Sequence, residues 1–363
     1  MGRWKTGSFT AAIGCIATGA IIVMAQYDVI TYEALGYLWP ALLILLGMEM
    51  LIRLFIKSDV KNHVSGWAIV LIILLVGASG AQTLLAGGPL SSLLGNTHLV
   101  SLSSSVEITD GLKNVKISIP NGRVKIEGTD GDTLDYEGSL LLPGSTEADA
   151  KAELEKKWKV HTEGDTLILE LEGQSNWLNG INIGFVSKSP YLNLSIPENL
   201  AVELDTEDGS IEAFGLHSGA DLETSNGTLD IHDMAGGLTA DTSNGTMSVQ
   251  NIKGGAKLVS SNGAITLSNV DGAVTAKSSN GKITINSAVT GDWKASSSNG
   301  KIVFSLPAVT NAKITAETSS GSLSGNVPWD RDGDNKGTAQ LGSGTYTVEL
   351  STSNGSVAVD TAE

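Results

Sequence analysis

Residues 226–245 read Asn-Gly-Thr-Leu-Asp-Ile-His-Asp-Met-Ala-Gly-Gly-Leu-Thr-Ala-Asp-Thr-Ser-Asn-Gly, which is one complete repeat between two Asn-Gly pairs. A constant step separates successive pairs, and a constant step indicates one supersecondary unit that is copied and stacked. The pairs are Asn226-Gly227, Asn244-Gly245, Asn262-Gly263, Asn280-Gly281 and Asn299-Gly300, in steps of 18, 18, 18 and 19 residues. We therefore expect the repeat to determine the architecture.

Apolar residues around each Asn-Gly pair predict two short strands per repeat. After the first pair, Leu229 and Ile231 are apolar and Asp230 between them is polar. Spacing of two is the strand period, which places the apolar residues on one face. A second set of glycines predicts a flexible corner at the other end of the repeat, because glycine reaches positive φ without a Cβ clash. This set comprises Gly219, Gly237, Gly255, Gly272 and Gly291.

Two architectures fit this repeat. In a β-solenoid, equivalent residues align in columns and each copy packs against the next. Asn-Gly between apolar runs is also typical of a type I′ hairpin, which would give an antiparallel β-meander. We favour the solenoid, because a meander has no reason to keep one 18-residue register. The stacked asparagines would then form an amide ladder, or asparagine occurs there only because it tolerates a left-handed turn.

The N-terminal region is apolar. Residues 7–25 and 67–86 contain no charged residue, and residues 35–56 contain only Glu49 and Arg53. Since about 20 apolar residues span a bilayer as a helix, we predict three transmembrane helices within residues 1–88. Basic residues before the first segment and between the second and third place the N-terminus in the cytoplasm by the positive-inside rule. The remainder of the chain is therefore expected outside the cell membrane.

Two features of this region have more than one interpretation. A cleaved signal peptide competes for the first segment, and Ala-Ile-Gly-Cys15 resembles a lipoprotein cleavage site, but apolar sequence continues past it. Glu49 and Arg53 are four residues apart and could form an ion pair within the membrane, or Arg53 could extend to the lipid headgroups. Cys15 is the only cysteine, so we expect stacking alone to hold the outer domain.

The outer part of the chain is strongly acidic. The first 90 residues contain five Lys or Arg and four Asp or Glu, which leaves 18 basic and 35 acidic residues beyond them. Such a surface repels phosphate backbones, so nucleic acid is not expected as a partner. Anionic wall polymers would also be repelled without bridging cations. Acidity that only keeps a long solenoid soluble is the simpler interpretation.

The composition divides the chain beyond the anchor into three parts. Residues 89–105 are rich in Ser, Gly and Leu and predict a tether. Residues 106–202 predict an irregular β region that caps the solenoid, with one short helix behind a Thr146-x-x-Asp149 capping box. Residues 203–363 predict the solenoid itself, whose last copies lose their spacing around an insertion.

The insertion contains a candidate calcium site. Asp330, Asp332 and Asp334 alternate as carboxylate ligands do in a calcium loop. Glycine falls at the fourth position of this loop, where the EF-hand has it at the sixth, and Leu341 replaces the bidentate Glu. We therefore favour an exposed loop over a metal site.

Other chemistry is sparse. The five histidines show no metal-ligand spacing and are expected at the surface. No Gly-x-Ser-x-Gly motif and no outstanding carboxylate pair predict catalysis, so we expect neither an enzyme nor a cofactor. Aromatic residues that could mark a binding face do not recur with the repeat; they are Trp177, Tyr191, Trp293 and Trp329.

Two parts of the sequence resemble known families. The stacked Ser-Asn-Gly units, together with residues 194–197 and 202–209 before them, resemble the putative-adhesin β-strand-repeat domain of bacterial envelope proteins over residues 100–360. Gly36-Tyr-Leu-Trp-Pro40 and the helix ending at Arg53 are similar to the membrane module of Lia-type envelope-stress proteins. The first resemblance implies a bacterial surface protein of unestablished activity, and the second implies a link with envelope stress.

These observations predict a non-catalytic scaffold or adhesin at the bacterial cell envelope, held in the lipid bilayer. Its partner would be a cell-wall polymer or another membrane protein. One alternative is a sensor or regulator of envelope stress that acts through its transmembrane helices. A second alternative is an enzyme that acts on wall glycans.

Overall fold

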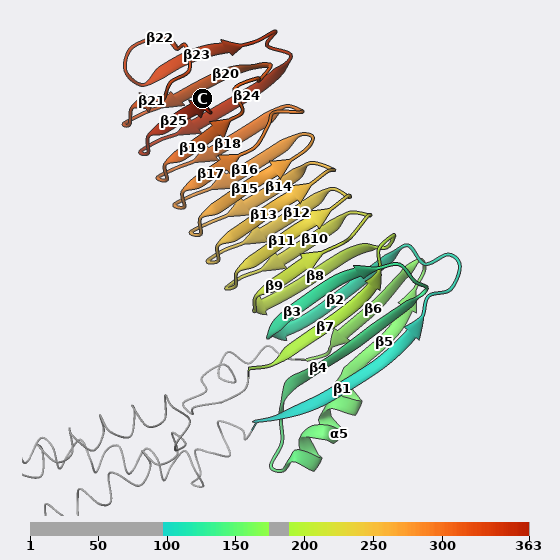
Figure 1. Cartoon of the computed structure of the whole chain (residues 1–363). Helices are drawn as coiled ribbons and strands as arrows, with labels where there is room; N and C mark the ends of the chain where they lie inside the picture. The colour runs from blue at the N-terminus through green and yellow to red at the C-terminus, as the bar shows by residue number, and fades with distance from the viewer. Residues whose placement is uncertain (1–96, 174–188, 363) are drawn as a thin grey trace, which may run out of the picture. The chain divides into compact units, whose positions relative to one another are not determined.

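The computed structural model describes residues 97–173 and 189–362. The three predicted transmembrane helices, Cys15 and the Glu49 and Arg53 pair lie outside these residues. Within the described ranges, no helix is both long and apolar enough to cross a bilayer. These ranges form two long β-sheets and one short helix (Figure 1).

The first sheet, sheet A, has twelve strands. In spatial order they are β1 (Thr97–Glu107), β4 (Thr133–Pro143), β7 (Tyr191–Pro197), β3 (Arg123–Thr129), β9 (Ile211–Phe214), β11 (Leu229–Met234), β13 (Met247–Ile252), β15 (Ile265–Val270), β17 (Ile283–Asn286), β19 (Ile302–Leu306), β25 (Val357–Thr361) and β21 (Leu323–Ser324). The strands from β7 to β21 pair in parallel, and β1 and β4 pair antiparallel at one end.

The second sheet, sheet B, has thirteen strands. In spatial order they are β22 (Asp330–Arg331), β23 (Lys336–Leu341), β20 (Ala312–Thr318), β24 (Tyr346–Thr352), β18 (Trp293–Ser297), β16 (Val274–Ser278), β14 (Ala256–Ser260), β12 (Leu238–Thr242), β10 (Ala220–Thr224), β8 (Ala201–Asp208), β2 (Asn114–Asn121), β6 (Thr166–Leu171) and β5 (Trp158–Glu163). Antiparallel pairs occur only near its two ends in the described residues.

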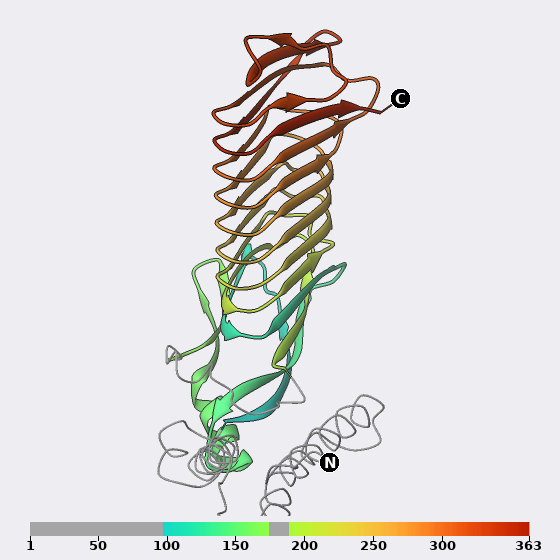
Figure 2. The ribbon, with the colours of Figure 1, turned by 90° about the vertical axis from the view of Figure 1, so that its left-hand side faces the viewer.

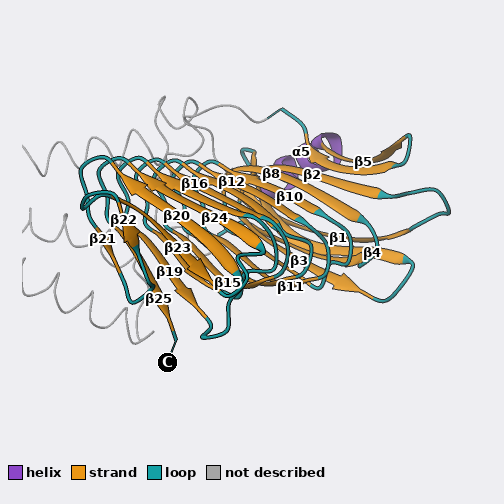
Figure 3. Ribbon diagram, turned by 90° about the horizontal axis from the view of Figure 1, so that it is seen from above, coloured by secondary structure: helices purple, strands orange, loops and turns teal. Residues whose placement is uncertain are grey.

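Each repeat contributes one strand to each sheet, which makes one rung of a solenoid-like stack (Figure 2). Equivalent residues of successive rungs pair in parallel and in register, so that Leu229 lies beside Met247, and Met247 beside Ile265. The two sheets lie face to face (Figure 3), and their inward apolar side chains form one continuous core. The meander is therefore wrong for the repeats, because each strand pairs in parallel with the equivalent strands of the rungs before and after it.

Close backbone contact explains the glycine of the Asn-Gly corner. None of the five Asn-Gly pairs has a positive φ. A Cβ on Gly263 would instead lie 1.5 Å from the carbonyl oxygen of Gly245, one rung away. Buried hydroxyl groups link neighbouring rungs at the same corner. Ser278 Oγ donates to the Gly263 carbonyl (3.4 Å) and accepts from the Gly281 N–H (2.8 Å). Any side chain at the glycine position would therefore push two rungs apart.

The asparagines of this corner form an amide ladder. Asn262 Nδ2 donates to Asn244 Oδ1 at 2.8 Å, and Asn280 Nδ2 donates to Asn262 Oδ1 at 2.7 Å. The ladder runs from the carboxylate of Asp208 at one end to Asn354 at the other. Of the two reasons that the sequence left open for asparagine here, the ladder is confirmed, and the left-handed turn is wrong.

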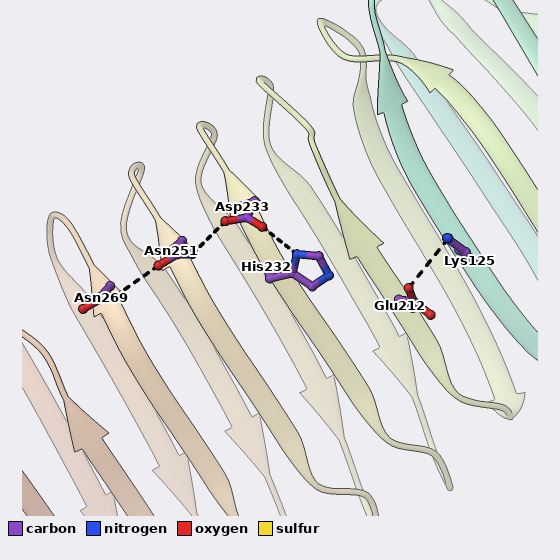
Figure 4. A network of polar contacts seen from close by, with 6 residues as sticks. All are labelled: Lys125, Glu212, His232, Asp233, Asn251 and Asn269. Atoms are coloured by element: carbon purple, nitrogen blue, oxygen red, sulfur yellow. Dashed lines mark hydrogen bonds and ion pairs between the residues drawn. The ribbon is translucent and has the colours of Figure 1, made fainter.

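Left-handed backbone occurs instead at the opposite corner. Asp233, Asn251 and Asn269 have φ of 55°, 57° and 51°, and they form a second, shorter ladder in Figure 4. Of the five glycines expected to have positive φ, only Gly255 and Gly272 do so. The expectation is wrong for Gly219, Gly237 and Gly291. Before Gly219 and Gly237 the left-handed residue of the turn is Gly215 or Asp233 instead, whereas Gly255 and Gly272 are left-handed in addition to Asn251 and Asn269.

The N-terminal end of the stack corrects two sequence predictions. Residues 114–129 form a regular rung that stacks directly on residues 201–214, although they were expected in the irregular cap. Residues 97–105 belong to strand β1 and not to a tether, because β1 pairs along its whole length with β4. Pairing with a distant strand orders this Ser-rich segment, and its composition does not reveal that.

The predicted helix is confirmed as α5 (Glu147–Lys157). Thr146 is its N-cap, and the side chains of Thr146 and Asp149 each bond to the other's backbone N–H. The helix contacts β1 and β4, and its buried residues, Ala150 and Leu154, belong to the hydrophobic core.

The C-terminal rungs are stacked out of chain order. Strand β24 lies between β18 and β20, so the last copy of the repeat is inserted before the preceding one. The insertion forms the β22–β23 hairpin, whose strand β23 pairs antiparallel with β20. This hairpin ends sheet B with β22, which has only two residues, and very short edge strands limit pairing with other chains.

Candidate binding surface

The outward side chains of sheet A form registered rows across the strands. One row consists of Ser105, Asp135, Ser195, Glu127, Phe214 and His232, taken from β1 to β11. A second row consists of Ser103, Glu137, Asn193, Lys125, Glu212 and Asp230. Because outward residues alternate with core residues along each strand, the rungs fix the position of every member of these rows.

A surface depression of about 570 Å³ lies over the first four strands of these rows. Among the described residues, those that line it carry mostly hydroxyl, amide and carboxylate side chains, and Lys125 is the one cation. Asn193 Nδ2 donates to Glu137 Oε1 at 3.3 Å, which orients both side chains within the depression. A smaller depression continues past Glu137 to Tyr191. We call the two together the sheet A groove.

An aromatic pair lies beside the sheet A groove. The rings of Phe214 and His232 stack at a centroid distance of 4.9 Å and an interplanar angle of 4°. Lys125 Nζ lies 3.9 Å from Glu212 Oε1 (Figure 4). The same Nζ lies 5.0 Å from the centre of the Phe214 ring. His232 Nδ1 lies 2.9 Å from Asp233 Oδ2. Hydrogen bonds from Asn251 and His232 lower the pKa of Asp233.

The outward face of sheet B has a different chemistry. Asp205, Glu223 and Asp241 are adjacent in one row, with Asp221 in the next row. Burial raises the pKa of Glu223 and of Asp241, and neighbouring carboxylates raise both further. Unlike the carboxylates around Lys125, these lie together without an intervening cation in the row. These carboxylates form an acidic strip. Beside the strip, a depression of about 500 Å³ contains the Lys116 and Glu203 ion pair, with Nζ and Oε1 2.6 Å apart.

The predicted calcium ligands are not brought together. Asp330 pairs with Thr338 within the β22–β23 hairpin, and the Asp332 N–H donates to the Lys336 carbonyl. Among the described residues, no group of three or more His, Cys, Asp or Glu side chains is arranged to hold a metal ion. The tight hairpin spreads the three aspartates along its exposed rim.

Of the other predicted residues, Trp177 lies outside the described residues, and those within them have structural or surface roles. The Asn-Gly residues form the corner that joins the rungs. Trp293 is a core residue, 2% exposed, whose ring stacks on Phe304. Tyr191 does reach the outward face and lines the groove. Phe214 was missed, although one signal was available: the equivalent positions in the next three rungs are His232, Gln250 and Ser268, so an aromatic residue there departs from the outward pattern.

Comparison with known families agrees with this architecture. The Toastrack DUF4097 family matches residues 142–360, which is more than half of the chain. The chain belongs to the Toastrack DUF4097 family. A LiaI-LiaF-like transmembrane region matches residues 9–51 and indicates membrane anchoring of this toastrack protein at its N-terminal part. Neither match indicates a catalytic family. None of the curated proteins matches the chain.

Three solved structures match this chain at low sequence identity. A putative adhesin from Bacteroides fragilis is 13% identical with a TM-score of 0.40, over 72% of this chain and 97% of its own. A putative cell adhesion protein from Clostridium sporogenes is 14% identical with a TM-score of 0.26, over 73% and 100%. A putative lipid binding protein from Parabacteroides distasonis is 11% identical with a TM-score of 0.32, over 72% and 97%. At these scores, none of them assigns a residue or an activity to this chain.

Proposed function

We propose that this toastrack protein is a membrane-anchored, extracytoplasmic scaffold that binds a component of the bacterial cell envelope without catalysis. The observation that carries the proposal is the registered outward face of sheet A, where hydroxyl, amide, charged and aromatic side chains lie at positions fixed by the rungs. A preorganised polar surface lowers the cost of ordering side chains on binding. The LiaI-LiaF-like transmembrane match supports the anchor.

Three helices and a cytoplasmic N-terminus are part of this proposal, because an odd number of crossings carries the β domain outside. Protease treatment of intact spheroplasts should digest a tag at the C-terminus. A tag that is protected until lysis would place the β domain in the cytoplasm and contradict the proposal.

Binding itself is tested with the full chain in detergent micelles. We expect it to sediment with purified cell envelopes and not with envelopes from which the wall has been digested. A chain that stays in the supernatant in both cases would refute the scaffold function.

A second candidate function rests on the transmembrane match alone. In this case the helices contact a membrane partner and regulate an envelope-stress response, with the β domain as sensor. Deletion of residues 100–363 distinguishes the two functions. If the truncated chain still supports normal stress signalling, the helices carry the activity; if signalling is lost, the β domain is required.

A further inference from the structure

We propose that strand β1 pairs antiparallel with the β1 strand of a second copy of this chain, so that sheet A continues through a two-fold symmetric dimer. The basis is the long and nearly uncharged edge that β1 gives to sheet A at the N-terminal end of the stack. An exposed edge of this kind is a template for pairing with another strand.

The four edge strands of the two described sheets differ in how well they resist such pairing. β21 and β22 have two residues each, and β5 has six, with Lys159, His161 and Glu163 at alternate positions. Short length and edge charges both limit pairing. β1 has eleven residues, no proline, unbroken pairing with β4, and one charged residue, Glu107, at its end. It therefore lacks the features that protect the other three edges.

The outer side of β1 is open among the described residues. Within these residues, the backbone of β1 pairs with β4 and makes no hydrogen bond to another segment. Helix α5 contacts β4 as well as β1, so it packs across both strands and does not take the place of a further strand. Sheet A extends three strands beyond β3, whereas sheet B extends two strands beyond β2 of the same rung. Sheet B therefore leaves the edge of β1 accessible.

The core is incompletely covered at this edge. Leu102 and Val106 of β1 pack against the hydrophobic core and remain partly exposed, whereas the equivalent inward residues of interior strands such as β3 are fully buried. One more strand beside β1 would cover both side chains. Pairing with another strand therefore adds apolar burial to the backbone hydrogen bonds.

Symmetry defines the register of a β1–β1 pair. Opposite residues of an antiparallel pair share one face of the sheet, so the two-fold axis passes through a residue. Full overlap of Thr97–Glu107 places this axis at Leu102, which then lies opposite its own copy, with Ser101 opposite Ser103. Because hydrogen-bonded pairs alternate with other pairs along such a ladder, this register supplies about ten backbone hydrogen bonds.

The side chains of β1 suit a second copy as the partner. Glu107 would lie opposite Thr97, so no like charges meet, and the opposed serines form hydroxyl pairs of the kind that stabilise sheets. The rest of the chain beyond residue 90 has 35 acidic and 18 basic residues, so copies repel each other elsewhere and associate at this uncharged edge. The transmembrane region holds the copies in one membrane, which raises their effective concentration. A strand of a soluble protein lacks that advantage.

Disulfide cross-linking of the full chain in lipid vesicles tests the register. In a Cys15→Ser background, a copy with Ser101→Cys and a copy with Ser103→Cys present opposite residues, with Cα atoms about 4.5–5.5 Å apart. We expect oxidation of this mixture to give a linked dimer. A mixture of Leu99→Cys and Ser101→Cys copies is four residues out of register and should stay unlinked. No linkage in the first mixture, or equal linkage in both, would overturn the proposal.

Charge variants test the association without cysteines. Ser101 and Ser103 are exposed, and lysine at both places like charges opposite each other across the dimer. Ser101→Lys with Ser103→Lys should lower the co-purification of two differently tagged full chains in detergent micelles at least about fivefold. Ser248→Lys with Gln250→Lys is the matched control, because these exposed residues have the same spacing on the interior strand β13. It should leave co-purification unchanged.

Opposite charges should restore the pair. A chain with Ser101→Lys and Ser103→Lys, mixed with a chain with Ser101→Glu and Ser103→Glu, should recover co-purification, which excludes misfolding of β1 as the cause of the loss. Undiminished co-purification of the lysine variant, or no recovery in the mixture, would refute β1 pairing. A wild-type chain that stays monomeric would also refute it and leave the edge open to a strand of another protein. Envelope sedimentation is a separate measurement, so the scaffold function stands or falls independently.

Discussion

The two corners of each rung contain the same residue types and use them for different physical reasons. At the Asn-Gly corner, glycine is required because the backbone of the next rung occupies the space of a Cβ, and asparagine donates along the stack. At the opposite corner, Asn251 and Asn269 adopt left-handed backbone, and the room for a Cβ varies: on Gly219 a Cβ would meet only an oxygen 3.5 Å away, whereas on Gly236 it would lie 1.8 Å from the Ser218 carbonyl oxygen.

This difference shows that the type of residue at a repeated position does not reveal why that residue occurs there. A glycine can occupy a position for its φ or for the space it leaves, and an asparagine can occupy one for its φ or for its amide. Substitutions that affect only one of these properties should therefore show which of them a given position requires.

The largest difference is expected between two Gly→Ala variants. Gly263→Ala places a Cβ 1.5 Å from the Gly245 carbonyl oxygen, so the rungs must separate. We expect a loss of at least about 3 kcal/mol in the free energy of unfolding. Gly219→Ala should change it by less than about 1 kcal/mol, since less conformational freedom in the unfolded chain offsets an ordinary contact. Urea unfolding of the full chain measures both, and equal effects would contradict the comparison.

The next effect is expected from the amide ladder. Asn262→Ala removes one bond to Asn244 and one from Asn280. At about 0.5–1.5 kcal/mol for each net hydrogen bond, and with both exposed, the loss should be about 1–2 kcal/mol. Asn286→Ala, an exposed asparagine outside both ladders, is the matched control. If both variants unfold at the same urea concentration, the ladder does not stabilise the stack.

A smaller effect should show whether the opposite corner requires asparagine for its positive φ or for its side-chain amide. Asn269 has a φ of 51° and donates to Asn251 at 3.2 Å. Alanine loses the bond and keeps the left-handed strain, while glycine loses the bond and relieves the strain. Asn269→Ala should therefore be less stable than Asn269→Gly by about 1 kcal/mol. The reverse order in thermal unfolding would show that backbone conformation does not select asparagine here.

The smallest effect concerns pH. Burial and neighbouring carboxylates raise the pKa of Glu223, so its charged form is disfavoured in the folded protein. The resulting loss of stability is absent below the unfolded pKa of the carboxyl and complete above the folded pKa. Glu223→Gln should therefore have the higher Tm at about pH 7 and the same Tm as wild type at about pH 3. A higher Tm at acidic pH only would reverse the sign and refute the stated cause.

Local patterns predicted the repeat well because they act within one rung. The step between Asn-Gly pairs, the apolar positions such as Ile231, and the capping box of Thr146 all depend on residues close in the chain. The transmembrane and toastrack regions were also recognised from their composition and repeat units.

Contacts between distant segments were not predictable in the same way. Residues 115–126 carry the strand-turn-strand pattern around Asn121-Gly122, but nothing in them shows that they stack on residues 201–214. Likewise, nothing in residues 346–361 shows that they enter the stack before residues 312–324. The groove depends on the same kind of contact, because β4, β7 and β3 meet only after these strands have found their neighbours.

Cysteine cross-linking tests the stacked-rung architecture most directly. In a chain with Cys15→Ser, the pair Thr266→Cys and Thr284→Cys occupies register partners on adjacent rungs of sheet A. Their Cα separation of about 4.8 Å is within disulfide range. The pair Lys277→Cys and Thr284→Cys would be opposite each other in a hairpin around Asn280-Gly281, but here β16 and β17 belong to different sheets. We predict that oxidation links the first pair and leaves the second pair free. A disulfide in the second pair alone would contradict the solenoid stack and restore the meander.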